Sequence, residues 1–177
     1  MKKILMLCLI IIMLFPVNIL AIGDISVNTD DIYVIKGESV SLNITFNNAA
    51  GRINISSSNE DIASVDVKSI FLDSNSEIIT INGVKNGTSV ISVYAYDVST
   101  YDNEDLSNNT YNLNVFVCTK GDINDDDKMD LNDVITLLKK YLHNSISARD
   151  ITLADMDNTG SIGLNDIVML IREYLNS

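Results

Sequence analysis

The C-terminal third of the chain repeats itself, and this repeat most constrains what the chain can fold into. A shift of 33 residues places the segment 122–144, DINDDDKMDLNDVITLLKKYLHN, over the segment 155–177, DMDNTGSIGLNDIVMLIREYLNS. The run LNDV returns as LNDI, and Tyr141 returns as Tyr174. Self-similarity at a fixed offset indicates one structural unit that is built twice.

Each repeat begins with a stretch that is rich in oxygen-bearing side chains. The segment 121–133 alone contains six Asp, and charges this dense repel one another unless something neutralises them. Side-chain oxygens at positions 1, 3 and 5, a carbonyl at position 7 and an acid at position 12 are the spacing of a calcium-binding loop. Ca²⁺ is a hard cation that takes six to eight oxygen ligands. The repeat therefore predicts two calcium sites.

The expected Ca²⁺ ligands occupy the same positions in both loops. In the first loop they are Asp122, Asn124, Asp126, the main-chain carbonyl of Lys128, Asp130 through a water, and Asp133. In the second loop they are Asp155, Asp157, Thr159, the main-chain carbonyl of Ser161, and Asp166. Position 6 makes a sharp turn that favours Gly; Gly160 meets this need, whereas the first loop has Asp127. Because Thr159 is a neutral hydroxyl where a carboxylate or amide is usual, we expect the first loop to bind Ca²⁺ more tightly.

An amphipathic helix follows each loop. The apolar residues recur at i, i+3, i+4 and i+7, as Val134, Leu137, Leu138 and Tyr141 and again as Ile167, Leu170, Ile171 and Tyr174. Each set forms one apolar stripe, and two such stripes can pack against each other as an antiparallel pair.

Before the repeat, residues 24–117 alternate with period two and favour β-strands. The segments that we expect to be strands are 25–29, 32–35, 39–46, 52–57, 76–81, 89–96 and 110–117. About seven strands with turns at short intervals predict an antiparallel β-sandwich of immunoglobulin (Ig) type. The stretches SSSNEDIASVD (56–66) and ITINGVKNGTSVISVYAY (79–96) resemble the bacterial Ig-like domain of group 2. Such modules are spacers and adhesive surfaces, so the resemblance implies a fold and no particular ligand.

The repeat itself resembles the dockerin of cellulosome-type assemblies, over residues 119–177. A loop and an exiting helix occur twice, position 12 is Asp, and no helix precedes the first loop. The resemblance implies two bound Ca²⁺ ions and, as partner, a cohesin module of a scaffold protein. It places the partner-binding residues at loop positions 10 and 11 and on the following helix, as Leu131, Asn132, Leu138, Lys139, Leu164, Asn165, Ile171 and Arg172.

The likeness of these two sets suggests that one cohesin can be bound in two orientations, related by a half-turn. An alternative gives the same residues a structural role. In that alternative Leu131 and Leu164 pack inward, and Asn132 and Asn165 cap the helices.

The expected organisation has two domains after a leader peptide. A signal peptide covers residues 1–21, an all-β Ig-like sandwich 22–118, and a small all-α dockerin of two loop–helix repeats 119–177. Lys2 and Lys3 precede an apolar run that is shorter than the roughly 20 residues of a membrane span, and Ala21 suits a cleavage site. We therefore expect a secreted protein, extracellular or associated with the cell surface, without a membrane span in the mature chain. An uncleaved N-terminal anchor is the alternative. Only Cys118, Thr119 and Lys120 separate the two domains, so the sandwich is placed to buttress the dockerin.

Charge and composition narrow the partners. Without residues 1–21 the chain has 10 basic and 24 acidic residues, a formal net charge of −14, which repels nucleic acid and anionic lipid. Cys118 is then the single thiol, so no intrachain disulfide can form.

We expect a non-catalytic protein that its dockerin anchors in a cellulosome-like or cell-surface assembly for polysaccharide degradation. Two alternatives are a small carbohydrate-active or carbohydrate-binding component, with polysaccharide as partner, and a calcium-stiffened adhesin of the cell surface. The acidic pairs Asp30–Asp31 and Glu104–Asp105 could serve as catalytic carboxylates, but solvated loop charges are the simpler interpretation. The β region also lacks Trp, which leaves little platform for a sugar cleft.

Overall fold

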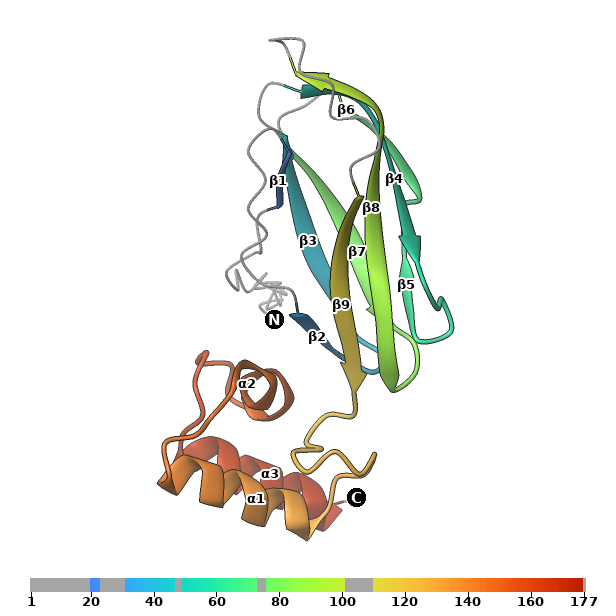
Figure 1. Cartoon of the computed structure of the whole chain (residues 1–177). Coiled ribbons are helices and arrows are strands. Elements are labelled where there is room, and N and C mark those ends of the chain that lie inside the picture. The colour runs from blue at the N-terminus through green and yellow to red at the C-terminus, as the bar shows by residue number, and fades with distance from the viewer. Residues whose placement is uncertain (1–19, 23–30, 47–48, 73–75, 101–109, 177) are drawn as a thin grey trace, which may run out of the picture.

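Two β-sheets and three helices make up the described chain (Figure 1). The computed structural model describes residues 20–22, 31–46, 49–72, 76–100 and 110–176. One sheet has the strand order β1 (Leu20–Ile22), β3 (Ser39–Phe46), β7 (Ser76–Gly83), β5 (Ala63–Val65). The other has the order β2 (Asp31–Ile35), β9 (Thr110–Cys118), β8 (Gly87–Thr100), β4 (Ala49–Ser57), β6 (Ser69–Leu72).

Alternating apolar residues from both sheets meet in one core. In the antiparallel pair β3–β7, Leu42 lies opposite Ile79, and both are buried. In the pair β4–β8, Ile55 lies opposite Val93, and both are again buried. β2 pairs with β9, and β1 with β3, in parallel. Branched side chains alternate with polar ones along these strands because each sheet has one face toward the core.

Most of the expected strands lie within observed ones. The expected segments 32–35, 39–46, 52–57, 76–81, 89–96 and 110–117 fall inside β2, β3, β4, β7, β8 and β9. The expected strand 25–29 lies outside the described residues. The short strands β5 and β6 were not expected from the sequence.

The helices form a layer at one end of the sheets (Figure 1). α1 (Leu131–Leu142) and α3 (Leu164–Asn176) contact each other, and α2 (Ala148–Ala154) lies between them and the sheets, in contact with β2. Asp130 caps α1, and Ser147 caps α2 in a capping box with Asp150. These caps satisfy N–H groups that a helix start leaves without partners.

A second core joins the helices to the strands, and it corrects the expected organisation. Its buried residues are Cys118, Ile123, Val134, Leu137, Leu153, Ala154, Ile162, Ile167 and Leu170. Ile35 of β2 and Phe116 of β9 pack against them. The expected fold class, an all-β sandwich followed by a separate small all-α dockerin, is therefore wrong. The described part of the chain is mostly β, and its three short helices share a core with two of its strands.

The outer face of the sheet explains this shared core. In β2 the buried residues Ile32 and Val34 face the sandwich interior. Tyr33 and Ile35, which alternate with them, point the other way. The Tyr33 ring stacks on Phe116, with 5.3 Å between ring centroids. Because side chains alternate between the faces of a strand, these outward apolar residues give the helices a surface to cover.

The expected leader, 1–21, lies mostly outside the described residues, and its last two residues belong to β1. Among the helices of the described part, none combines the length and the apolar character of a membrane crossing. The boundaries 1–21, 22–118 and 119–177 stay predictions.

Candidate metal centre

The two acidic loops have the same backbone shape. Positions 4 and 6 of each loop are in the left-handed region, with φ of 70° and 66° at Asp125 and Asp127 and of 57° and 79° at Asn158 and Gly160. Asp and Asn adopt this conformation more readily than other residues that carry a Cβ. The first loop thus makes the turn at position 6 with Asp127, without the Gly that its counterpart uses.

The first ligand position of each loop carries an Asp that closes the turn. Asp122 accepts the N–H groups at positions 5 and 6 of its loop, at 3.1 and 2.9 Å. Asp155 accepts the N–H groups at the same positions of its own loop, at 3.0 and 2.7 Å. Asp122 is buried, and burial raises the pKa of its carboxyl, although the backbone donors act in the opposite direction. A nearby cation would favour the ionised carboxylate.

The twelfth position connects each loop to the helix that follows it. The Asp133 carboxylate accepts the N–H groups at positions 2, 3 and 9, at 2.8, 3.0 and 2.7 Å. Asp166 accepts the equivalent three groups at 2.8, 3.2 and 2.8 Å. Both carboxylates are buried in the first turn of their helices, where negative charge is favoured.

The second loop brings three of its predicted ligands together. Carboxylate oxygens of Asp155, Asp157 and Asp166 lie within 4.8 Å of one another. Asp157 Oδ2 accepts a hydrogen bond from the Asn165 amide at 2.8 Å, which lowers the pKa of the Asp157 carboxyl. Its other oxygen, Oδ1, is buried and has no hydrogen-bond partner. An orphaned carboxylate oxygen beside two further carboxylates fits a hard divalent cation, because buried acceptors otherwise find a donor.

The remaining predicted ligands take part in bonds within their loops. Asn124 and Asp126 bond to each other through the amide group and a carboxylate oxygen, at 3.1 Å. The N–H group of Lys128 donates to Asp126 Oδ1, and Asp130 Oδ1 accepts from the N–H group of Asn132. In the second loop the hydroxyl of Thr159 donates to the Ser161 carbonyl, at 3.2 Å. All eleven predicted ligand residues therefore lie on two loops of matching shape, and the bound metal stays a prediction.

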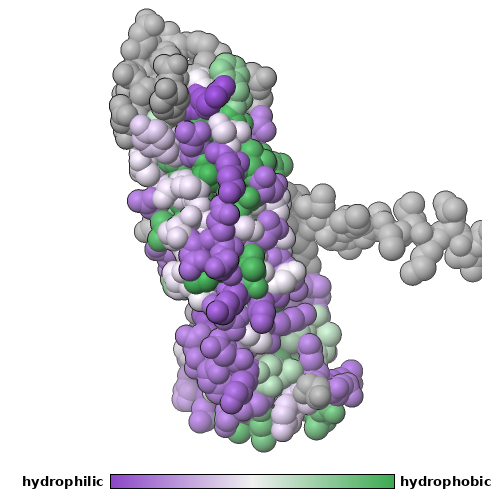
Figure 2. All heavy atoms as spheres, turned by 90° about the vertical axis from the view of Figure 1, so that its right-hand side faces the viewer, coloured by the Kyte–Doolittle hydropathy of each residue, from purple (hydrophilic) through white to green (hydrophobic). Residues whose placement is uncertain are grey.

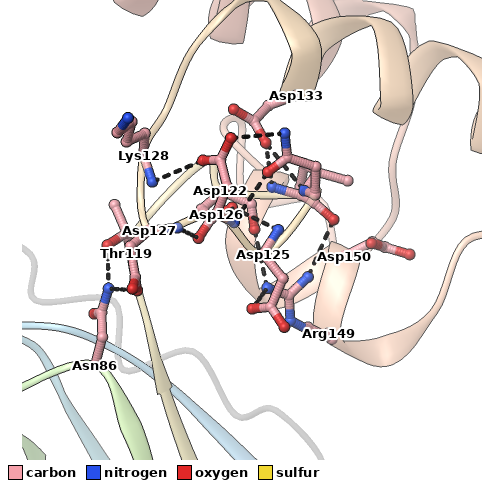
Figure 3. Close-up of polar contacts among 12 residues, drawn as sticks. Asn86, Thr119, Asp122, Asp125, Asp126, Asp127, Lys128, Asp133, Arg149 and Asp150 are labelled. Carbon is pink, nitrogen blue, oxygen red and sulfur yellow. Dashed lines mark hydrogen bonds and ion pairs between the residues drawn. The ribbon is translucent and has the colours of Figure 1, made fainter.

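Two residues outside the predicted site hold the first loop (Figure 3). Arg149 of α2 donates to the carbonyls of Asp122 and Ile123 and pairs with the Asp125 carboxylate at 2.8 Å. Asn86, in the turn between β7 and β8, donates to Asp127 Oδ1 at 2.6 Å. Neither residue has a signal in the sequence that ties it to this loop, since 24 and 41 residues separate the bonded pairs.

The predicted partner-binding residues lie mostly at the surface of the helix pair. Leu131 and Leu164 are 49% and 60% exposed, so they do not pack inward. Asp130, and not Asn132, caps α1, while Asn165 bonds to Asp157 of its own loop. Of the other predicted residues, Ile171 is half-buried, and the exposed ones are Leu138, Lys139 and Arg172.

Further exposed apolar residues extend this surface, and the sequence interpretation missed them. They are Ile135 and Leu142 on α1 and, 33 residues later, Val168 and Leu175 on α3. The 33-residue offset was the available signal, because it relates the two pairs directly. Figure 2 shows apolar patches at the base of the molecule, which is where α1 and α3 lie in Figure 1. We call the exposed apolar residues of α1 and α3 the paired helix face.

Of the acidic pairs considered as catalytic carboxylates, only Asp31 lies among the described residues. It is exposed at the start of β2 and accepts a hydrogen bond from the Asn114 amide. Asp30, Glu104 and Asp105 lie outside the described part of the chain.

Comparison with known proteins finds matches among solved structures only. No family model matches the chain, and no curated protein matches it in sequence. Among solved structures, domains 5–6 of the S-layer protein SbsC are 20% identical, with a TM-score of 0.41 over 54% of this chain and 43% of that chain. The C. elegans MSP family member WR4 is 13% identical, with a TM-score of 0.40 over 50% of this chain and 93% of that one. The chain spans less than half the length of the S-layer chains it matches. Likeness at this level identifies neither a family nor a function.

Proposed function

We propose that this protein is a calcium-dependent binding protein whose two loops each hold one Ca²⁺ and whose paired helix face binds a cohesin module. The proposal rests above all on the equivalence of Asp133 and Asp166. Each accepts the same three N–H groups of its loop and lies in the first turn of the helix that carries one half of the paired helix face.

Calcium would act on the fold of the loops. Bound Ca²⁺ supplies positive charge that neutralises the crowded carboxylates and keeps each loop closed. The loops set where α1 and α3 begin, and hence where the paired helix face lies. If the dissociation constant is a thousandfold below the ambient calcium, binding adds about 4 kcal/mol to stability.

The paired helix face supports a protein partner. Three exposed apolar residues of α1, Leu131, Ile135 and Leu142, repeat at equivalent places on α3 as Leu164, Val168 and Leu175. Leu138 is a fourth exposed residue of α1, and its counterpart Ile171 is half-buried. Single exposed apolar residues are common, whereas several of them on two neighbouring helices favour an interaction surface. The resemblance of residues 119–177 to dockerins specifies a cohesin as that partner. This function and the leader-like residues 1–21 both favour secretion of the protein and a location at the cell surface.

Binding to a panel of immobilised cohesin modules, one of each type, tests the proposal. We expect capture of the full chain in 1 mM CaCl₂ and release in EDTA. A variant with Asp133→Asn and Asp166→Asn should not be captured, whereas the exposed sandwich variant Asp61→Asn, which also removes an acid, should be captured normally. Capture that persists in EDTA, or no capture by any cohesin although two Ca²⁺ ions bind, would refute the proposed function. Insoluble cellulose and xylan in a parallel assay test the carbohydrate-binding alternative.

A further inference from the structure

We infer that the β7–β8 turn of the sandwich presets the first calcium loop through Asn86, and that this contact replaces the Gly that the loop lacks at position 6. The inference rests on the proposed function, because it concerns the affinity of one of the two calcium sites. Asn86 is a positioning residue in this account, since it touches the loop and not the metal.

The contact is short and specific. The side-chain amide of Asn86 donates to Asp127 Oδ1 at 2.6 Å and to Thr119 Oγ1 at 2.7 Å (Figure 3). The Asp127 carboxylate can only accept, which fixes the orientation of the amide, and the Thr119 hydroxyl accepts the second N–H. The carbonyl oxygen Oδ1 of Asn86 is buried without a partner. The Asn86 side chain thus leaves its carbonyl oxygen without a hydrogen bond, while its NH₂ group makes two. The bond to the Asp127 carboxylate is charge-assisted.

The contact falls where the first loop departs from the second. Asp127 holds φ at 66°, a conformation that is unfavourable for a residue with a Cβ. Its N–H group closes the loop on Asp122, as the N–H group of Gly160 does on Asp155. A Cβ added at Gly160 would meet nothing within 4 Å, so no side chain from outside the second loop packs against this side of its turn. In the first loop, the anchored side chain of Asp127 holds the turn.

Arg149 supports the loop from the side of α2. Its guanidinium group bonds to the carbonyls at positions 1 and 2 of the loop and to the carboxylate at position 4. The first loop is thus held from the sandwich and from a helix that contacts β2. In the second loop, within the described part of the chain, the side-chain hydrogen bonds of the five ligand residues stay between residues 155 and 166.

The consequence concerns the calcium-free protein. Without calcium, the six Asp of the first loop repel one another and favour an open loop. A contact that holds the loop closed raises the fraction of molecules that can bind calcium. The apparent dissociation constant is inversely proportional to this fraction, so it falls by the same factor. The sandwich therefore tunes the first site and leaves the second unchanged.

Calcium titration by calorimetry on the full chain and its Asn86→Ala variant tests this inference. We expect the variant to weaken the first site about tenfold, the equivalent of one lost charge-assisted hydrogen bond, and to leave the second within twofold. The matched control is Asn82→Ala. Asn82 lies on β7, and the change removes the hydrogen bond that it accepts from the hydroxyl of Ser39 on β3, away from the loop. Asp133→Asn and Asp166→Asn variants assign each measured step to its loop.

A second background separates preorganisation from damage to the fold. In an Asp127→Gly chain, position 6 is free to turn by itself, so adding Asn86→Ala should change the first site by less than twofold. Hydrogen exchange in EDTA gives a readout without metal: the amides at 125–127 should exchange faster in Asn86→Ala than in Asn82→Ala.

Four outcomes would overturn the inference. If both sites weaken equally, or if Asn86→Ala has the same effect in the Asp127→Gly chain, Asn86 does not act through Asp127. If two Ca²⁺ ions bind and Asn86→Ala matches Asn82→Ala at both sites and in exchange, the contact has no role, while calcium binding stands. If the unmodified chain binds no calcium, the proposed function fails and this inference fails with it.

Discussion

Lys140 of α1 and Asp150 of α2 form an ion pair of 2.6 Å in which the carboxylate is fully buried and the ammonium group is partly exposed. The Asp150 carboxylate also accepts the N–H and hydroxyl groups of Ser147, which caps α2. One buried acid thus connects α1 to the helix that lies against the sheets.

The first prediction concerns pH. Burial opposes ionisation of Asp150, but the hydrogen bonds from Lys140 and Ser147 outweigh it and lower the pKa of the carboxyl below its usual 3.8. A lowered folded-state pKa contributes stability above the unfolded-state pKa, and this stability is lost as the pH falls through the folded-state value.

We expect Asp150→Asn to lower the free energy of unfolding by about 2–3 kcal/mol at pH 7, since hydrogen bonds to a charged group are lost. The difference from the unmodified chain should shrink as the pH falls below 4. Urea unfolding at pH 7, 5 and 3.5, with calcium in excess, measures it. A difference that stays constant with pH would mean that the charge of Asp150 contributes nothing.

The second prediction concerns the twelfth loop position. Asp166→Asn replaces an acceptor of three N–H groups with an amide and removes one charge from the cluster with Asp155 and Asp157. We expect the second calcium step to disappear from a calorimetric titration and the first to stay within twofold. Asp61→Asn, an exposed change on the sandwich, should leave both steps intact. Loss of both steps would show that the two loops do not bind independently.

The third prediction concerns the shared core. Phe116→Ala removes the ring that stacks on Tyr33 and packs against the helical core. Because Phe116 is only half-buried, we expect a loss of about 2 kcal/mol, below the range for a fully buried Phe. Calorimetric unfolding should change from one transition to two as the helices separate from the sheets. One unshifted transition would show that this contact does not couple them.

The fourth prediction concerns the two orientations of the partner. Leu131 and Asn132 recur as Leu164 and Asn165, so a half-turn presents nearly the same surface. Replacing only the first pair with Ala should therefore weaken cohesin binding less than threefold, and replacing both pairs should abolish it. If the first change alone abolishes binding, the partner uses a single orientation.

The sequence predicted the elements better than it predicted how they join. Alternation located the long strands, and the 3.6-residue period located α1 and α3. The strands β5 and β6 have three and four residues, too few to show a period. α2 has seven residues, although its capping box, Ser147 with Asp150, was a readable signal.

The expected separate helical domain failed for a physical reason. A hydrophobic period predicts which face of a helix or strand is buried. It does not predict which other element packs against that face. Ile35 and Phe116 lie on the outer face of their sheet, and only the tertiary structure reveals that they pack against the helical core. The contact between Asn86 and Asp127 is beyond sequence patterns for the same reason, since it spans 41 residues and no period relates the two.

The most direct test of the central claim is a calcium titration of the full chain by isothermal calorimetry, with far-UV circular dichroism recorded before and after. The account predicts two Ca²⁺ ions per chain, a gain in helical signal on binding, and no binding in the chain that carries both Asp133→Asn and Asp166→Asn. Absence of calcium binding by the unmodified chain, or equal binding by the doubly substituted chain, would contradict it.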